Sequence, residues 1–135
     1  MCPEFAADVR DYQHHITGDI SFAMRQYLAV TGDTSMLRDS VNGNSGCQFV
    51  RDMADFWVSR LSYNAATGLY DIRGVMGPDE YHANVTNNVY TNIIAALAVN
   101  FANLTQCAAQ CEGIPQVLSH TYYHDMGFNI LSGVG

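Results

Sequence analysis

Residues 87–103 read NNVYTNIIAALAVNFAN, and this stretch decides the fold class. It lies in a longer region between Glu80 and Glu112 that contains no charged residue when histidine is counted as neutral. A helix without charge on any side is usually buried on most sides. Its asparagines make it unlike a helix that faces lipid. We therefore expect a helix from about Asn87 to Asn103 or beyond, placed inside a larger all-helical assembly.

A first long helix is predicted earlier in the chain. Thr17 can cap its N-terminus, and Gly32 lies where a left-handed residue would end it. The apolar residues at helical spacing in this segment are Ile20, Met24, Tyr27 and Leu28. A short helical turn is expected around residues 35–40. The asparagine, serine and glycine residues at 42–46 then predict a loop.

A second long helix is expected over about residues 47–62. A wide apolar stripe on one side of it is opposed by charged residues on the other. The stripe consists of Phe49, Val50, Met53, Phe56, Trp57 and Leu61. Residues 64–68 predict a turn, and the alternating pattern of residues 69–72 predicts a short strand that ends at Gly74.

The composition excludes several functional classes. The chain has 135 residues, about the length of one domain, with 13 acidic and 6 basic residues and a net charge of -7. Six scattered basic residues supply neither a nucleic-acid footprint nor attraction to an anionic membrane. A hydrophobic content of 48% excludes intrinsic disorder. Only 14% of the residues are charged, against about 25% in a typical domain. We therefore expect the chain to be part of something larger.

The termini and cysteines indicate a reduced, cytoplasmic setting. Pro3, Glu4 and Asp8 would interrupt the apolar region of a signal peptide. The longest apolar run, at 93–99, is far shorter than the ~20 residues of a membrane span. The cysteines are too few and too irregularly spaced for a secreted disulfide scaffold. They are Cys2, Cys47, Cys107 and Cys111.

The loop RGVMGPDEYH at residues 73–82 is the strongest candidate for chemistry. Two glycines and a proline stiffen it, and four polar residues close it: Asp79, Glu80, Tyr81 and His82. Loops on a rigid scaffold often carry sites. The alternative is that its acidic residues cap the next helix. Because neighbouring side chains in an extended segment point to opposite sides, at most one of the two carboxylates acts in a hydrolase pair.

Two histidine groups are further candidates. Because adjacent side chains cannot face one pocket together, at most one of His14 and His15 binds a ligand, and a structural role is the alternative for each. A zinc site could be formed by Cys107, Cys111, His120 and His124. However, the gap of eight residues between its cysteine and histidine pairs differs from the ~12 of a classical finger, and the cysteines continue a helix that is expected to be buried. We expect no metal and no cofactor.

Four segments resemble glycoside hydrolase family 65. They are VMGPDEYH at 75–82, NVTNNVYTN at 84–92, HITGDI at 15–20 and ADFWVSR at 54–60. Tyr27 and Thr31-Gly-Asp33 are also similar to the family. The family contains disaccharide phosphorylases, acid trehalases and an animal glucosidase branch, and the segment at 76–88 is most similar to that branch. The resemblance covers roughly residues 10–105.

This resemblance implies a fold and a chemistry. It implies an (α/α)6 toroid, of which residues 1–135 would form roughly a third as one partial catalytic domain, with 106–135 as an unassigned tail. It implies that Glu80, on a short strand and loop, is the general acid that protonates the glycosidic oxygen of an α-glucoside. The family inverts configuration, so water or phosphate attacks from the opposite face. The residues expected to contact substrate are His15, Asp79, Tyr81 and His82.

The chain also departs from the family. The family's earlier Trp-Asp segment of the sugar pocket and its later Lys-Gln segment have no counterpart here. The downstream region that carries the hydrolase base or the phosphorylase phosphate site is also absent. Gln13-His14 stand where the family often has an acidic residue. We therefore expect the isolated chain to be inactive. The leading hypothesis is part of an α-glucosidase of the glucosyl-galactosyl-hydroxylysine type. The alternatives are a phosphorylase of the family and a non-catalytic, truncated relic that binds sugar or partner chains.

Overall fold

The computed structural model describes residues 5–41 and 43–108, in which helices predominate. In chain order the elements are α1 (Phe5–Tyr12), α2 (His15–Thr31), α3 (Ser35–Arg38), β1 (Ser40–Val41), β2 (Asn44–Ser45), α4 (Gly46–Ser59), β3 (Leu61–Asn64), β4 (Leu69–Ile72) and α5 (Val89–Ala108). The strands of the described part form only two antiparallel hairpins, β1–β2 and β3–β4. The expected all-α class is confirmed, and the arrangement is consistent with part of a helical toroid.

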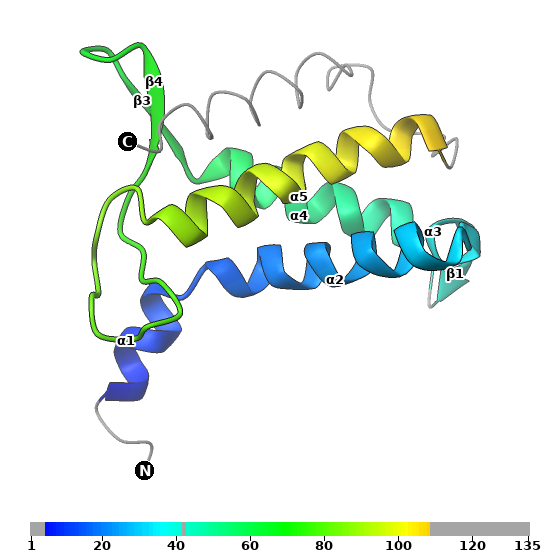
Figure 1. The fold of residues 1–135 in the computed structure, drawn as a ribbon, viewed down its shortest axis with the longest axis horizontal. Coiled ribbons are helices and arrows are strands. Elements are labelled where there is room, and N and C mark those ends of the chain that lie inside the picture. Colours follow the sequence, from blue (N-terminus) through cyan, green and yellow to red (C-terminus); the bar gives the residue numbers. More distant parts are fainter. Residues whose placement is uncertain (1–4, 42, 109–135) are drawn as a thin grey trace.

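The three long helices lie side by side, with α5 packed against both α2 and α4 (Figure 1). The core is formed where their apolar faces meet. Its buried residues are Leu37, Val50, Met53, Ala54, Trp57, Ile72, Val75, Ile94, Ala95, Ala96, Ala98, Val99, Phe101 and Ala102. Half of these residues belong to α5. The buried, uncharged helix that the sequence predicts is therefore confirmed, and its C-terminus lies beyond Asn103.

A close approach between α2 and α5 depends on a glycine. A Cβ atom built on Gly18 would lie 2.7 Å from Cγ2 of Ile94. Glycine is unfavourable inside a helix, by about 1 kcal/mol relative to alanine. Its presence at this position is explained by the short distance between the two helices.

The start and the outer face of α2 differ from the prediction. The helix begins at His15 rather than after Thr17, so Thr17 is not its N-cap. Gly32 ends it with φ of 66°, as expected. Two of the residues predicted to form its apolar face, Ile20 and Tyr27, are 45% and 47% exposed. Both residues lie on the side of α2 that faces away from the core. The helix therefore carries apolar residues on both sides, because Met24 and Leu28 pack against the core.

The second helix is shorter than predicted. The Ser45 hydroxyl caps α4 by accepting a hydrogen bond from Gln48 N at 3.2 Å. The helix ends at Ser59 rather than Ser62, because residues 61–64 pair with residues 69–72 as β3 and β4. Leu61 therefore belongs to a strand, and Phe49 is 46% exposed. The turn at 64–68 and the strand at 69–72 are confirmed.

The segment between α2 and α4 also contains an unpredicted hairpin. The helical turn expected near 35–40 is α3. β2 lies within the region predicted as a loop and pairs with β1, which directly precedes that region. Cys47 is disulfide-bonded, which corrects the expectation that the cysteines are reduced. The side chains of the other three cysteines lie outside the described residues. Within residues 5–41 and 43–108, no helix combines the length and apolarity needed to cross a bilayer.

Candidate functional site

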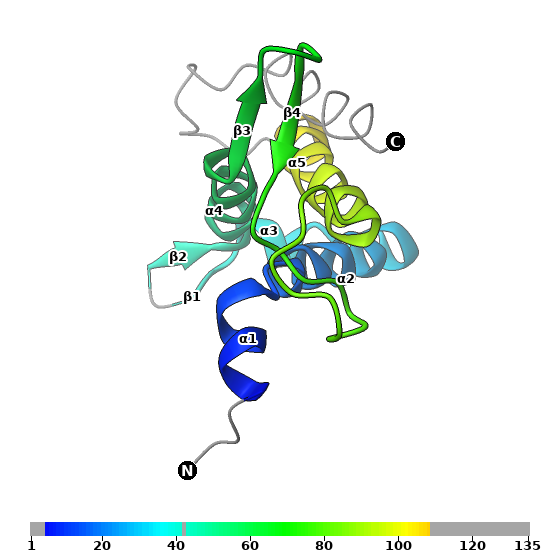
Figure 2. The ribbon, with the colours of Figure 1, turned by 90° about the vertical axis from the view of Figure 1, so that its left-hand side faces the viewer.

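Residues 73–88 connect β4 to α5 and form a closed loop at one end of the helices. Val75 and Val85 form an antiparallel bridge, with N···O distances of 3.1 and 2.9 Å. Met76 N donates to the carbonyl of Tyr12 at 2.9 Å, which ties the loop to the end of α1. Figure 2 shows the loop beside α1 and the first turn of α2. The candidate residues at its tip are therefore held near the N-terminal end of α2.

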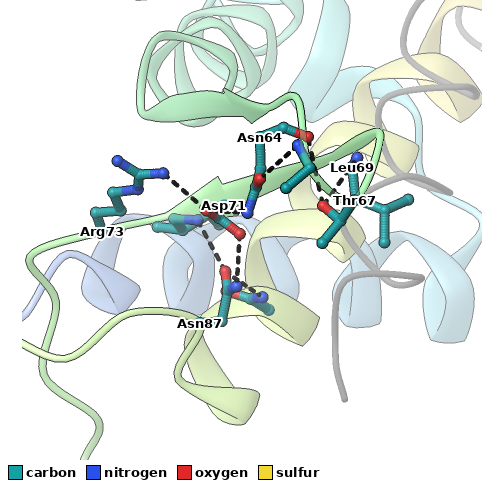
Figure 3. Close-up of polar contacts among 9 residues, drawn as sticks. Asn64, Thr67, Leu69, Asp71, Arg73 and Asn87 are labelled. Carbon is teal, nitrogen blue, oxygen red and sulfur yellow. Dashed lines mark hydrogen bonds and ion pairs between the residues drawn. The ribbon is translucent and has the colours of Figure 1, made fainter.

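The base of the loop is organised around the buried carboxylate of Asp71 (Figure 3). Asn87 Nδ2 donates to its Oδ1 at 2.9 Å. Arg73 Nη2 and Asn64 Nδ2 donate to its Oδ2 at 3.0 and 3.2 Å. These hydrogen bonds, from Asn87 first and then from Arg73, hold the pKa of Asp71 below its ordinary value. The carboxylate thus links β4 to β3 and to both ends of the loop.

Asn87 joins the two ends of the loop directly. Its backbone N donates to the carbonyl of Ile72 at 2.8 Å, and its Oδ1 accepts from Ile72 N at 2.9 Å. Asn92 Nδ2 donates to the same Oδ1 at 3.3 Å. The φ of Asn87 is 57°, a left-handed conformation that asparagine adopts more readily than most residues. The sequence contains no local signal for this arrangement, because the partners are separated by the whole loop.

Glu80 has a strained backbone. Its φ is 59°, whereas the other left-handed residues of the loop are asparagines and Gly74. A left-handed conformation at such a residue costs roughly 1–3 kcal/mol and persists only where the surroundings enforce it. Its side chain is exposed, and its Oε1 accepts a hydrogen bond from Gln13 Nε2 at 3.1 Å. Strain of this kind is concentrated at functional sites, so it makes Glu80 the leading candidate on structural grounds as well.

The other loop residues lie next to Glu80 on the exposed tip. His82 Nδ1 lies 2.8 Å from Asp79 Oδ2, and this hydrogen bond lowers the pKa of Asp79. Tyr81 is 89% exposed. The acidic residues do not cap the next helix, because α5 begins only at Val89 and Asn88 Oδ1 accepts from the N–H of its first turn at 3.0 Å. The capping alternative is therefore wrong.

His15 lies between two helices rather than at the loop tip. It is only 6% exposed, and its Nδ1 lies 2.9 Å from Asp19 Oδ2. The Tyr90 hydroxyl donates to Asp19 Oδ1 at 2.6 Å, which raises the pKa of Tyr90. The His15 and Tyr90 rings also meet edge to face, with centroids 5.4 Å apart. His15 thus joins α2 to α5 at the end where the loop lies.

His14 faces a different neighbour. Its ring meets that of Phe56 on α4 edge to face, at 6.0 Å between centroids. Burial and then the charge of Arg60 lower the pKa of His14. The two adjacent histidines therefore do face different surroundings, as expected.

Metal binding is not indicated in the described part of the chain. Residues 5–41 and 43–108 contain no group of three histidine, cysteine or carboxylate side chains that could hold a metal ion. The zinc alternative concerns Cys107, Cys111, His120 and His124, whose side chains lie outside the described residues.

Sequence comparison identifies relatives of known class. The glycosyl hydrolase family 65 central catalytic domain matches residues 2–122. Protein-glucosylgalactosylhydroxylysine glucosidase from Gallus gallus is 41% identical over 103 residues, which cover 76% of this chain and 14% of that protein. Kojibiose phosphorylase from Caldanaerobacter subterraneus is 40% identical over 85 residues, 63% of this chain and 10% of that protein.

A third relative extends the range of reactions. The 1,2-alpha-glucosylglycerol phosphorylase from Bacillus selenitireducens is 36% identical over 114 residues, again covering 76% of this chain and 14% of that protein. The chain therefore spans about a seventh or less of the length of these curated relatives. Glucosidases and phosphorylases both occur among them.

Proposed function

Because the chain belongs to glycosyl hydrolase family 65, we propose that it carries the general acid of an inverting reaction on an α-glucoside, and that this acid is Glu80. The observation that carries the proposal is the enforced left-handed backbone of Glu80, on a loop closed at its base. Such strain clusters at active sites and ligand clamps, where it forms part of the mechanism. The relatives named above act on glucosyl compounds, which supports the substrate class.

The proposed step is a proton transfer. Glu80 donates its proton to the glycosidic oxygen as the bond to glucose breaks, and a nucleophile attacks from the opposite face. Gln13 donates to Oε1 of Glu80, which leaves Oε2 to carry the proton towards substrate. In the hydrolytic reaction, a second carboxylate activates water at about 6.5–9.5 Å from the acid. We expect that base from outside the described residues.

The leading form of the proposal is hydrolysis of a terminal α-linked glucose of the glucosyl-galactosyl-hydroxylysine type. The similarity to glucosidases of that name in Gallus gallus and Danio rerio, at 41% and 40% identity, supports it. A phosphorylase is the second candidate, because kojibiose phosphorylase matches at 40% identity. Both reactions use the same acid and differ in the nucleophile, water or phosphate. Asp79, Tyr81 and His82 are proposed to contact the sugar beside Glu80. His15 is proposed to support the site by holding the first turns of α2 and α5 together.

The exposed apolar stripes support the proposal of a partial domain. On α2 the stripe consists of Ile16, Ile20, Tyr27 and Val30, and the exposed large apolar residues of α5 are Val89, Tyr90, Ile93 and Leu104. A monomeric domain rarely leaves such continuous apolar stripes exposed. We infer that further helices of a complete toroid cover them. We expect the isolated chain to lack turnover for the same reason.

A chimera tests Glu80 in a complete catalytic domain. Residues 10–105 replace the matching segment of the Gallus gallus glucosidase, and glucose release is measured with Glu80 and with Glu80→Gln. A general acid contributes about 10²–10⁴ in rate, so we expect kcat to fall by that factor while KM changes little. Asp52→Asn, which changes an exposed carboxylate of α4 outside the loop, is the matched control and should retain most turnover.

The outcomes test the assignment of Glu80 and separate a catalytic from a non-catalytic segment. Unchanged turnover in the Glu80→Gln chimera contradicts the assignment of Glu80. A folded chimera that binds substrate without turnover, although it contains Glu80, supports the non-catalytic alternative. When residues 10–105 replace the matching segment of kojibiose phosphorylase, we expect activity that depends on inorganic phosphate. The rest of that phosphorylase, and not the exchanged segment, then determines the nucleophile.

A further inference from the structure

We propose that Asp71 and Asn87 form a clamp that positions Glu80, so that both are positioning residues for the proton transfer. The proposal deepens the proposed function and rests on Glu80 being the acid. Neither residue touches the Glu80 side chain, and the clamp acts through the backbone of the loop between them. Figure 3 shows Asn87 directly below Asp71, with dashed lines between them.

The clamp joins the two ends of the loop at residues 73–88. The amide of Asn87 donates to the carboxylate of Asp71 at 2.9 Å, and two further hydrogen bonds join Asn87 to Ile72 at 2.8 and 2.9 Å. The bridge between Val75 and Val85 lies just beyond the clamp. Three hydrogen bonds and then a two-bond bridge therefore hold both ends of the segment that contains Glu80.

The clamp is also anchored to the helices. Asn92, in the first turns of α5, is fully buried and donates to Asn87 Oδ1 at 3.3 Å. On the other side, Arg60 at the end of α4 donates to the carbonyl of Arg73 at 3.3 Å. The loop ends are thus set relative to α4 and α5 together. This arrangement fixes the position of the loop relative to the N-terminus of α5 and the C-terminus of α4.

The strained backbone supplies the argument for positioning. Glu80 and Asn84 both have left-handed φ, of 59° and 57°. Such conformations persist only where the surrounding structure enforces them. If the ends of the loop were not held, the backbone of Glu80 would return to an ordinary, negative φ. We infer that opening the clamp releases Glu80 from φ near 59°, and moves its carboxyl away from Gln13.

A swap of the two side chains tests this directly. Asp71→Asn and Asn87→Asp each leave two like groups facing each other, whereas the double variant D71N/N87D restores an amide and a carboxylate with the roles reversed. In the double variant the new carboxylate at position 87 would still accept from Ile72 N. The new amide oxygen at position 71 would still accept from Arg73. Thr67→Ala is the matched control, because Thr67 bonds to Asn64 and Leu69 in the same hairpin without touching Asp71.

The measurements are made by NMR on the 135-residue chain. We read amide exchange at Val75 and Val85 and the backbone coupling constant that reports φ of Glu80. In each single variant we expect exchange at the bridge to be faster by roughly tenfold or more, since a hydrogen bond to a charged group is lost. We also expect loss of the left-handed coupling at Glu80. Exchange in the middle of α5 should stay within about twofold, because the helix keeps its core contacts. The double variant should recover both signals.

Three results would overturn the proposal. They are an unchanged Glu80 coupling in both single variants, equal loss of protection throughout α5, and no recovery in the double variant. In the glucosidase chimera, the single variants should lower kcat with little change in KM, and the swap should restore it. Because the NMR signals need no turnover, they test the clamp separately from the proposed function. If Glu80→Gln leaves turnover unchanged, the role in proton transfer is overturned, while the coupling constant still shows whether the clamp sets the backbone of Glu80.

Discussion

The layer of α2, α4 and α5 and the loop at residues 73–88 are held in place by different interactions. In the layer, apolar side chains such as those of Trp57 and Phe101 are buried between helices. In the loop, side chains at the tip are exposed, and hydrogen bonds around Asp71 and Asn87 hold its base. Apolar burial is non-directional, whereas hydrogen bonds set the orientation of the groups that they join.

This difference explains why strain is confined to the loop. The left-handed residues other than glycine in the described chain are Glu80, Asn84 and Asn87, all in this loop. The helices provide a rigid support, and directional bonds hold the loop against its own backbone preference. Changes in the layer should therefore alter global stability, while changes in the loop should alter local structure. The predictions below test that division.

The largest effect is expected from Trp57→Ala in α4. Trp57 is completely buried, and removal of such a side chain costs about 3–5 kcal/mol in unfolding free energy. Denaturant unfolding of the 135-residue chain measures it. Phe49→Ala in the same helix is the control, because Phe49 is 46% exposed and should cost less than about 1 kcal/mol. Equal losses would contradict the division between core and surface in α4.

A smaller effect is expected where α2 meets α5. Gly18→Ala places a methyl group about 2.7 Å from Ile94, and we expect a net loss of about 1 kcal/mol after the gain in helix propensity. In an Ile94→Ala background the loss should disappear, because the clashing atoms are absent. A double-mutant cycle measured by denaturant unfolding provides the coupling. Additive effects would show that the close approach is not what requires glycine.

In the loop, Gly74→Ala should cost about 1 kcal/mol through its backbone. Gly74 has φ of 65°, and the nearest atom to an added Cβ lies 3.7 Å away, so steric crowding is minor. Gly74→Asn should cost less, since asparagine tolerates this conformation. Amide exchange at Val75 and Val85 should report the change, with exchange in α5 little affected. Equal effects of alanine and asparagine would argue against a conformational cause.

The smallest effect on the free energy of unfolding is expected when the pH is lowered until Asp71 is protonated. Hydrogen bonds from Asn87 and Arg73 lower the pKa of Asp71, so its contribution is present above the unfolded value of about 3.9. That contribution is lost as the pH falls through the lower, folded pKa. We expect the NMR shifts of the loop amides to change in this range before those of α5 do. In Asp71→Asn this step should be absent at the amides of Ile72 and Asn87, while the loop tip still responds to Asp79. A simultaneous change at Ile72, Asn87 and α5 in the unsubstituted chain would contradict the prediction.

The sequence predicted the parts of the fold that depend on local pattern. The uncharged stretch at 87–103 indicated α5, and Gly32 was placed correctly as a left-handed residue. The predicted end of α4 was wrong because the apolar stripe continues into Leu61, which pairs with Ile72 instead. Nothing in residues 59–62 alone distinguishes a further helical turn from a strand. The partner strand decides between them.

The candidate site was also predicted only in part. The loop and its polar residues could be recognised from the spacing of glycine, proline and acidic residues. Asp71 and Asn87 were not singled out, and Gln13 was noted only as a departure from the family, because each of the three acts on a distant residue. The contact from Gln13 to Glu80 spans 67 positions, and that from Asn87 to Asp71 spans 16. The position of His15 was not foreseen either, because Asp19 and Tyr90 hold it between helices.

Taken alone, the sequence determined that this chain forms buried helices with one stiff polar loop between the second and third long helices. Those features follow from side-chain periodicity, absence of charge and glycine conformation, which a short window of residues contains. The tertiary structure decided how the ends of the loop are joined and which backbone conformation Glu80 adopts. Hydrogen bonds between residues far apart in the chain exist only after the helices have brought their partners together.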